Sequence, residues 1–133
     1  MKKTIATIIT ALIVLSASAQ TKVRCNIVKK GYWINNEWVW SEPSYEIIDF
    51  TLYKNDVYVS DKAHSHYQTY NGRETKRKDS YVYTWDATDE NGRSCALVMN
   101  FIYESKSLYL TVMYNDVAFD YKEQQGLSNL NNN

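Results

Sequence analysis

The feature that most constrains the fold of this chain is a series of short β-branched and aromatic runs that begins after residue 20. Asn, Asp, Gly and Ser separate these runs at intervals of about 8–12 residues, and helical periodicity is hard to find in the same region. The chain carries twelve Tyr against three Phe, with only one Pro and four Gly. This composition excludes collagen-like, coiled-coil and low-complexity proteins. We therefore predict an all-β fold.

The runs predict about eight strands within residues 20–123, which we interpret as a single domain. Consecutive hairpins of this kind form an antiparallel meander that either closes as a barrel or folds over as a two-layer sandwich. The sequence leaves both architectures open. The Asn71-Gly72 pair predicts a tight turn, so that residues 73–79 would form an exposed hairpin end. Residues 124–133 are rich in Asn and are expected to be a flexible tail.

Residues 1–19 have the three parts of a secretory signal peptide: a basic start, an apolar run and a small-residue cleavage site. Lys2 and Lys3 precede the run, and Ala17 and Ala19 precede the expected cut before Gln20. The run is shorter than the roughly 20 residues that a bilayer-spanning helix needs, and no later stretch is long enough. We therefore expect an exported protein, periplasmic or extracellular, without a membrane span.

Export gives the two cysteines, Cys25 and Cys95, a structural interpretation. A lone pair in an oxidising compartment more often forms a disulfide than a metal or catalytic site. Closing a loop of about 70 residues would stabilise the fold by roughly 4 kcal/mol in the chain-entropy model. We predict a Cys25–Cys95 bridge, with two buried free thiols as the alternative.

The first hairpin carries the densest group of aromatic residues. If the Asn35-Asn36 pair forms a two-residue turn, Trp33 lies opposite Trp38 and Tyr32 lies opposite Val39. Trp40 would then share one face with the other two Trp residues. Three Trp side chains on a rigid sheet can belong to the core, or they can bind a protein partner or stack on sugar rings.

Both interpretations of the three Trp side chains, as core or as binding surface, remain open, because the sequence does not show which side of the hairpin points inward. The surplus of Tyr favours a surface with the polar-aromatic composition of an interface. Our candidate binding residues are Trp33, Trp38, Trp40 and Tyr32.

Two other segments contain potential metal ligands. His64 and His66 would point to one side of a strand and Asp61 could add a third ligand, but no further His is present to complete a stable site. Residues 86–91 bring oxygen ligands together at a spacing that differs from that of a calcium loop. We interpret the first segment as a solvated loop and the second as a hairpin turn, and we expect no metal and no cofactor.

No catalytic signature is present either: the chain has no Gly-x-Ser-x-Gly, no glycine-rich phosphate loop and no free Cys–His pair once the cysteines are bridged. A basic cluster (Arg73, Lys76, Arg77 and Lys78) is interleaved with acidic residues, and we interpret it as a charged loop. Fifteen basic residues balance fifteen acidic ones. Together with export, this balance argues against a nucleic-acid partner.

The Trp-rich hairpin, the turn and strand at residues 89–95 and the closing segment 108–121 together resemble small exported all-β proteins of uncharacterised function from Gram-negative gut bacteria. The resemblance covers most of the chain after residue 19. It implies export and the fold class, and it brings no catalytic residues.

We therefore expect a non-enzymatic interaction protein of the inhibitor, immunity or accessory type, with another protein as its partner. One alternative is a β-barrel that binds a small apolar or glycan ligand. The other is a hydrolase whose active site the sequence does not show.

Overall fold

The structure, a computed structural model, describes residues 21–124. The expected signal peptide and nearly all of the expected tail lie outside these residues. Within them the chain is all-β, as predicted, with nine strands. These are β1 (Thr21–Ile34), β2 (Glu37–Trp40), β3 (Ser44–Leu52), β4 (Asp56–Val59), β5 (His66–Lys76), β6 (Ser80–Asp89), β7 (Ser94–Ile102), β8 (Ser107–Met113) and β9 (Val117–Glu123).

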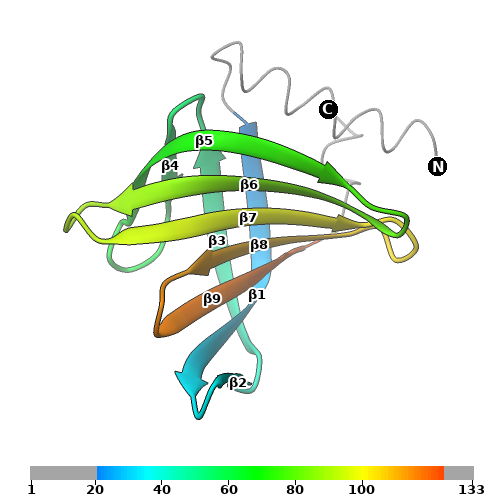
Figure 1. Cartoon of the computed structure of the whole chain (residues 1–133), viewed down its shortest axis with the longest axis horizontal. Helices are drawn as coiled ribbons and strands as arrows, with labels where there is room; N and C mark the ends of the chain where they lie inside the picture. The colour runs from blue at the N-terminus through cyan, green and yellow to red at the C-terminus, as the bar shows by residue number, and fades with distance from the viewer. Residues whose placement is uncertain (1–20, 125–133) are drawn as a thin grey trace.

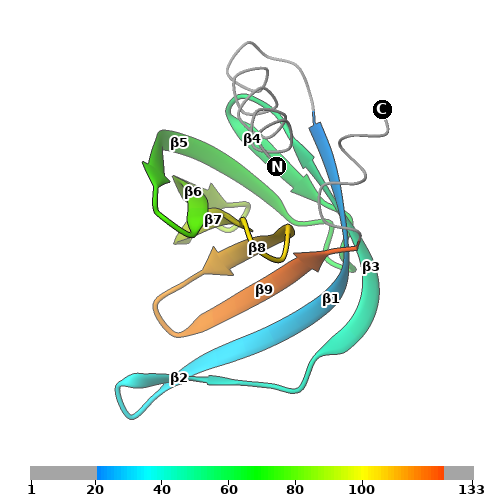
Figure 2. The same cartoon turned by 90° about the vertical axis from the view of Figure 1, so that its right-hand side faces the viewer.

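The meander closes into a barrel because the first strand pairs with the last. Neighbouring strands follow the order β2-β1-β3-β4-β5-β6-β7-β8-β9, all antiparallel, and β1 also pairs with β9. Eight strands form the closed wall, and β2 is an additional strand beside the end of β1 (Figures 1 and 2). Of the two architectures that the sequence left open, the structure therefore has the barrel and not the two-layer sandwich.

Alternation along the strands fills the inside of the barrel with apolar side chains. Strand β7 directs Leu97, Met99 and Phe101 into the barrel, and each of these side chains is nearly inaccessible to solvent. Their ladder partners on β8 are also buried, as expected for paired residues that share one face. One hydrophobic core therefore runs through the barrel; its largest fully buried side chains include Phe50, Tyr81, Phe101, Leu52, Leu97 and Leu108.

A β-bulge in β1 changes which side chains point inward. Between Cys25 and Ile27, β1 advances by two residues while β9 advances by one, so Asn26 is an extra residue against β9. The register against β3 shifts at the same place, but there the extra residue lies on β3. Before the bulge, Val23 and Cys25 are buried in the core; after it, Val28 packs against the core and Ile27 lies on the outer wall. The bulge thus decides the orientation of every later side chain of β1.

The prediction of a hairpin turn at Asn71-Gly72 was wrong. Strand β5 continues through both residues to Lys76, and its register against β6 shifts between Tyr70 and Arg73. The pair forms a bulge, with Asn71 at φ +53°. A Cβ on Gly72 would lie 2.5 Å from the Tyr83 hydroxyl oxygen, so the close approach of Tyr83 explains the need for Gly.

Candidate binding surface

The β1–β2 hairpin has the turn and the register that the sequence predicts. Asn35 and Asn36 have φ values of +53° and +64°, as a two-residue turn that follows the twist of the strands requires. Asn tolerates this left-handed region better than most residues. Trp33 pairs with Trp38, Tyr32 with Val39 and Gly31 with Trp40.

The three Trp residues lie on the outer face of the hairpin and do not belong to the barrel core. Trp33 and Trp40 are 46% and 41% exposed, and Trp38 is half-buried. The rings of Trp33 and Trp38 are in an edge-to-face arrangement, with their centroids 5.4 Å apart. The ring centroids of Trp38 and Trp40 are 6.1 Å apart. Of the two alternatives that the sequence left open, the structure therefore excludes the one in which the cluster belongs to the core. Whether these residues bind a partner stays a prediction.

Trp40 is held against the barrel wall by a gap in the side chains of β1. A Cβ on Gly31 would lie 2.8 Å from Cε3 and 2.9 Å from Cζ3 of the Trp40 ring. The ring therefore lies directly on the backbone of Gly31. Ala118 is the partner of Gly31 on β9. It points away from the core, because its neighbours Val117 and Phe119 are the residues of β9 that pack against the core. Ala118 is nevertheless fully buried.

The opposite face of the hairpin is also apolar and exposed. Tyr32, Ile34 and Val39 are 44%, 47% and 46% exposed. The Lys30 ammonium lies 5.3 Å from the ring centroid of Tyr32 and 5.5 Å from that of Phe119, close enough for cation–π attraction. Tyr32, the fourth candidate residue, thus lies on the face away from the Trp residues.

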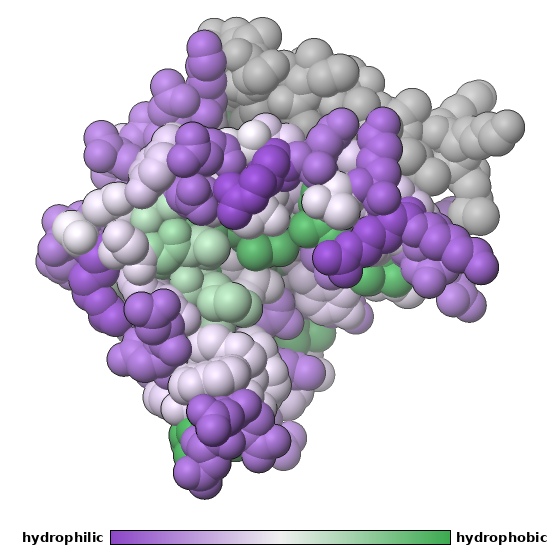
Figure 3. Space-filling model, viewed as in Figure 1, coloured by the Kyte–Doolittle hydropathy of each residue, from purple (hydrophilic) through white to green (hydrophobic). Residues whose placement is uncertain are grey.

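The hairpin lies at one end of the barrel (Figures 1 and 2). Its β1 edge is attached to the barrel wall as far as Trp33, two residues before the turn, and its other end is fixed at Ser41. The backbone N–H of Trp33 donates to the carbonyl of Asp116, in the β8–β9 turn, at 3.0 Å. Ser41 is joined to Lys30 twice, by N–H to carbonyl at 2.7 Å and by Lys30 N–H to Ser41 Oγ at 3.0 Å. The space-filling view shows this lower part of the molecule as a pale surface of intermediate hydropathy with a hydrophilic tip (Figure 3).

A groove on the outer wall was not predicted from the sequence. It has a volume of about 200 Å³ and lies where β3, β1, β9 and β8 run side by side. Its lining residues are Ile27, Lys29, Pro43, Tyr45, Tyr109, Asp120 and Lys122.

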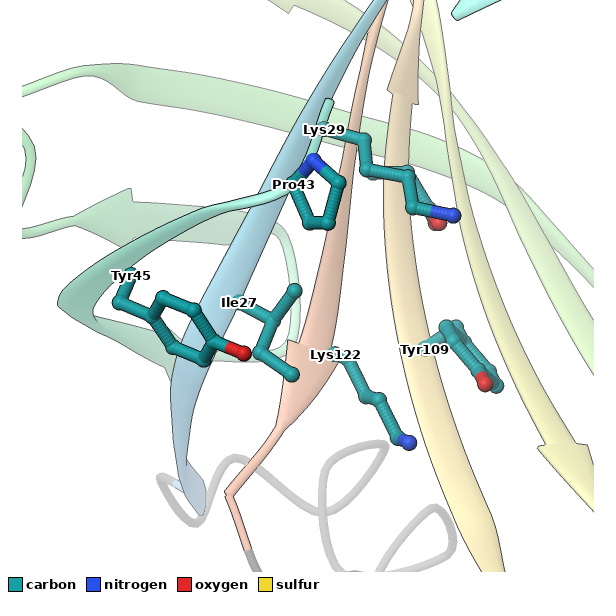
Figure 4. Close-up of a pocket in the computed structure, with 7 residues that line it drawn as sticks. Ile27, Lys29, Pro43, Tyr45, Tyr109 and Lys122 are labelled. Atoms are coloured by element: carbon teal, nitrogen blue, oxygen red, sulfur yellow. The ribbon is translucent and has the colours of Figure 1, made fainter. Parts of the chain in front are cut away.

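Two cross-strand rows build this groove. The first runs Tyr45, Ile27, Lys122, Tyr109 across the four strands, since each residue is the ladder partner of the next. The second runs Lys29, Asp120, Thr111. Tyr45 and Tyr109 lie at the two sides of the groove, with Ile27 and Lys122 between them (Figure 4).

The two histidines do not share a site. His66 lies in β5, stacked on Tyr58 with ring centroids 4.3 Å apart, and its Nε2 is 2.9 Å from Asp56 Oδ1. His64 belongs to the loop before β5, at φ +51°. Asp61, the proposed third ligand, instead accepts hydrogen bonds from Ser65. Within residues 21–124 there is no group of three or more His, Cys, Asp or Glu side chains arranged to hold a metal ion.

The acidic segment at residues 86–91 is only partly a hairpin turn, because residues 86–89 belong to β6 and the turn follows Asp89. Asp89 Oδ1 accepts the backbone N–H groups of Asn91 and Arg93, each at 2.9 Å, and its Oδ2 accepts the Tyr114 hydroxyl at 2.7 Å. Burial opposes ionisation of Asp89, but these hydrogen bonds and the charge of Arg93 outweigh it and hold the pKa of the carboxyl below its usual value. Both oxygens of the Asp89 carboxylate thus already accept hydrogen bonds from the protein.

The predicted Cys25–Cys95 disulfide was wrong, because both thiols are free. Strands β8 and β9 separate β7 from β1 in the wall. Following the ladder from Ile27 through Lys122 and Tyr109 leads to Asn100 of β7. Cys95 lies five residues from Asn100 along β7, which is roughly 17 Å at about 3.4 Å per residue. A disulfide needs Cα atoms within about 7 Å.

Both thiols are held protonated by their surroundings. Burial raises the pKa of Cys25 to about 12, and the nearby negative charge of Glu123 adds to the shift. Burial also raises the pKa of Cys95 to about 11, against a smaller lowering effect of the nearby Tyr114 hydroxyl. These thiols lack the thiolate character that a nucleophile requires.

Glu123 at the end of β9 is the most unusual ionisable group in the barrel. The residue is 2% exposed, and neither carboxylate oxygen has a hydrogen-bond partner among the described residues. Burial raises its pKa to about 7. The side chain is therefore largely uncharged below neutral pH.

Comparison with known proteins finds no matching family model, no matching curated protein and no matching solved structure. Among residues 21–124 there is no helix of the length and apolar character needed to cross a membrane.

Proposed function

We propose that this is an exported, non-enzymatic protein that binds another protein by inserting its β1–β2 hairpin into a cleft of that partner. The observation that carries the proposal is that both faces of the hairpin present large apolar side chains to solvent. Trp33 and Trp40 lie on one face, and Tyr32, Ile34 and Val39 lie on the other. A soluble domain rarely exposes apolar side chains in such a concentration without a function.

The two-faced exposure favours a protein over a flat or small ligand. A sugar ring that stacks on Trp33 and Trp40 would cover one face and leave the other in water. A cleft that receives the hairpin covers both faces at once. Aromatic side chains lose little rotamer entropy on binding, so they are effective anchors at the centre of an interface.

The attachment of the hairpin to the barrel wall adds to the expected affinity. The Trp33 and Lys30 hydrogen bonds fix the hairpin before a partner arrives, so that less conformational entropy is lost on association. The inward-facing side chains of the barrel pack together in one core, which favours the outer surface over the interior as the binding region.

The test is affinity capture from the native cell envelope with the exported protein as bait, followed by titration of the purified partner. Trp33→Ala and Trp40→Ala should each weaken the binding of that partner by about 2 kcal/mol, roughly 30-fold. Tyr70→Ala is the matched control, because Tyr70 is 47% exposed on β5, outside the hairpin. We expect that change to leave the affinity unaltered.

Equal binding by the two Trp variants and the original protein would remove the hairpin from the function. Turnover of a substrate that survives these substitutions but is lost on His64→Ala or on replacement of an acidic residue would place the protein among the hydrolases instead. The export part of the proposal has its own test. An intact mass of the extracytoplasmic protein that begins at Gln20, without an acyl chain, supports it, and retention of residues 1–19 contradicts it.

A further inference from the structure

We infer that the groove between Tyr45 and Tyr109 is a second binding site, which takes an acidic sugar residue. This inference is independent of the hairpin and of the protein partner proposed for it. The groove is a defined cavity of about 200 Å³ in the outer wall. Four neighbouring strands contribute to it, so its shape is set by the ladder and not by mobile loops.

The groove carries two lysine side chains without an ion-pair partner. Lys29 and Lys122 both line it, and within residues 21–124 neither makes a salt bridge. The Lys122 ammonium lies 5.9 Å from the ring centroid of Tyr109. Together the two ammonium groups outweigh the single carboxylate of Asp120, so the groove attracts an anionic group.

Asp120 supplies the second requirement, an acceptor for hydroxyl groups. Its Oδ1 accepts the Thr111 hydroxyl at 2.8 Å, whereas no protein donor among the described residues reaches its Oδ2. A carboxylate oxygen of this kind can accept a hydrogen bond from a ligand hydroxyl. A simple inorganic anion such as chloride has no hydroxyl group to donate to this oxygen.

The aromatic and aliphatic walls supply the third requirement. Tyr45 is 80% exposed at one side of the groove, with Ile27 beside it and Pro43 next to it (Figure 4). Such surfaces can lie against the C–H face of a sugar ring. A neutral sugar would leave the two ammonium groups unused, whereas a hexuronic acid residue has a carboxylate, several hydroxyls and an apolar ring face. It therefore uses every part of the groove.

The experiment is calorimetric titration of the exported protein with a short oligogalacturonate. Its methyl ester serves as the neutral probe of the same shape, and a pentaglutamate peptide as an anion without sugar hydroxyls. We expect binding of the acid only. Lys122→Gln and Lys29→Gln should each weaken it about ten-fold or more, as loss of a charged hydrogen bond predicts, and 1 M salt should weaken it further because the Debye length falls to about 3 Å.

Lys62→Gln is the matched control, since Lys62 is exposed on the β4–β5 loop, outside the groove. Trp33→Ala should also leave oligogalacturonate binding unchanged, which separates this site from the hairpin. Equal binding of the methyl ester, preference for pentaglutamate, absence of binding to all three probes, or full binding by both groove variants would each overturn the inference.

Discussion

The Trp40 ring lies on the backbone of Gly31, at a distance that leaves no room for a Cβ. The two residues are ladder partners across β1 and β2, and their contact keeps the Trp face of the hairpin close to the barrel wall. Gly31 does not have a positive φ, unlike Gly92. Its role is therefore to provide space, and a larger residue can test that role without straining the backbone.

Gly31→Ala should displace the Trp40 ring outward while the barrel stays folded. The new Cβ would lie 2.8 Å from Trp40 Cε3, and a ring that is already 41% exposed can move into solvent. We expect stronger quenching of tryptophan fluorescence by acrylamide, weaker binding of the partner proposed for the hairpin and a nearly unchanged Tm. Unaltered quenching would show that the ring does not depend on Gly31 for its position.

Replacement of individual Trp residues should separate the surface from the core. Trp85 is 7% exposed and packs in the barrel core, in contact with Tyr83. We expect Trp85→Ala to lower the free energy of unfolding by about 3–5 kcal/mol. Trp40→Ala should cost only about 1 kcal/mol or less, because the ring is largely at the surface. Urea unfolding of both variants measures the difference, and equal losses would contradict the placement of Trp40 outside the core.

Both cysteines should be recovered as thiols. We expect two thiol equivalents when the protein is unfolded without reductant, and almost no reaction of the native protein at neutral pH. The physical reason is that burial raises the thiol pKa to about 12 for Cys25 and about 11 for Cys95. Titration with an aromatic disulfide reagent makes the measurement. A denatured, unreduced sample without free thiol would restore the Cys25–Cys95 bridge.

Glu123 should make the protein less stable as the pH rises. Its pKa is about 7 in the folded protein, against an ordinary value of 4.5, so the folded state holds a proton that the unfolded state releases. The associated stability is fully present below pH 4.5 and is lost as the pH rises to about 7, by roughly 3 kcal/mol. Unfolding free energies at pH 4.5 and pH 8 measure this loss.

Glu123→Gln is the variant that isolates this effect, because the amide has the same shape and does not ionise. It should be more stable than the original protein at pH 8 and nearly equal to it at pH 4.5. Parallel pH profiles of the two proteins would show that Glu123 is already solvated or paired in the folded state.

The hairpin register was predictable from the sequence because it depends on neighbouring residues alone. The Asn35-Asn36 turn fixes which residue of β2 lies opposite Trp33, and alternation then orders the rest. The orientation of the hairpin was not predictable in the same way. Without the bulge at Asn26, Trp33 would share the inward-facing row of Val23 and Cys25.

The groove and the cysteines show a second limit of sequence reasoning. Lys29 and Asp120 are ladder partners although they are far apart in the chain, and only the closure of the barrel brings them together. Cys25 and Cys95 stay apart even in the closed barrel, because β9 and β8 separate their strands and Cys95 lies five residues along β7 from the ladder row of Ile27. The Asn71-Gly72 pair also led to a wrong prediction, because the same two residues that favour a tight turn form a bulge within β5, where Gly72 leaves room for Tyr83.

The length of β1 couples the hairpin mechanically to the barrel. The first part of the strand pairs with β3, the middle and end pair with β9, and the last residues pair with β2. A partner that pulls on the hairpin along β1 therefore loads these ladders in shear, so that many hydrogen bonds resist together instead of opening one after another. The hairpin should therefore resist being pulled out of the wall in the direction of β1.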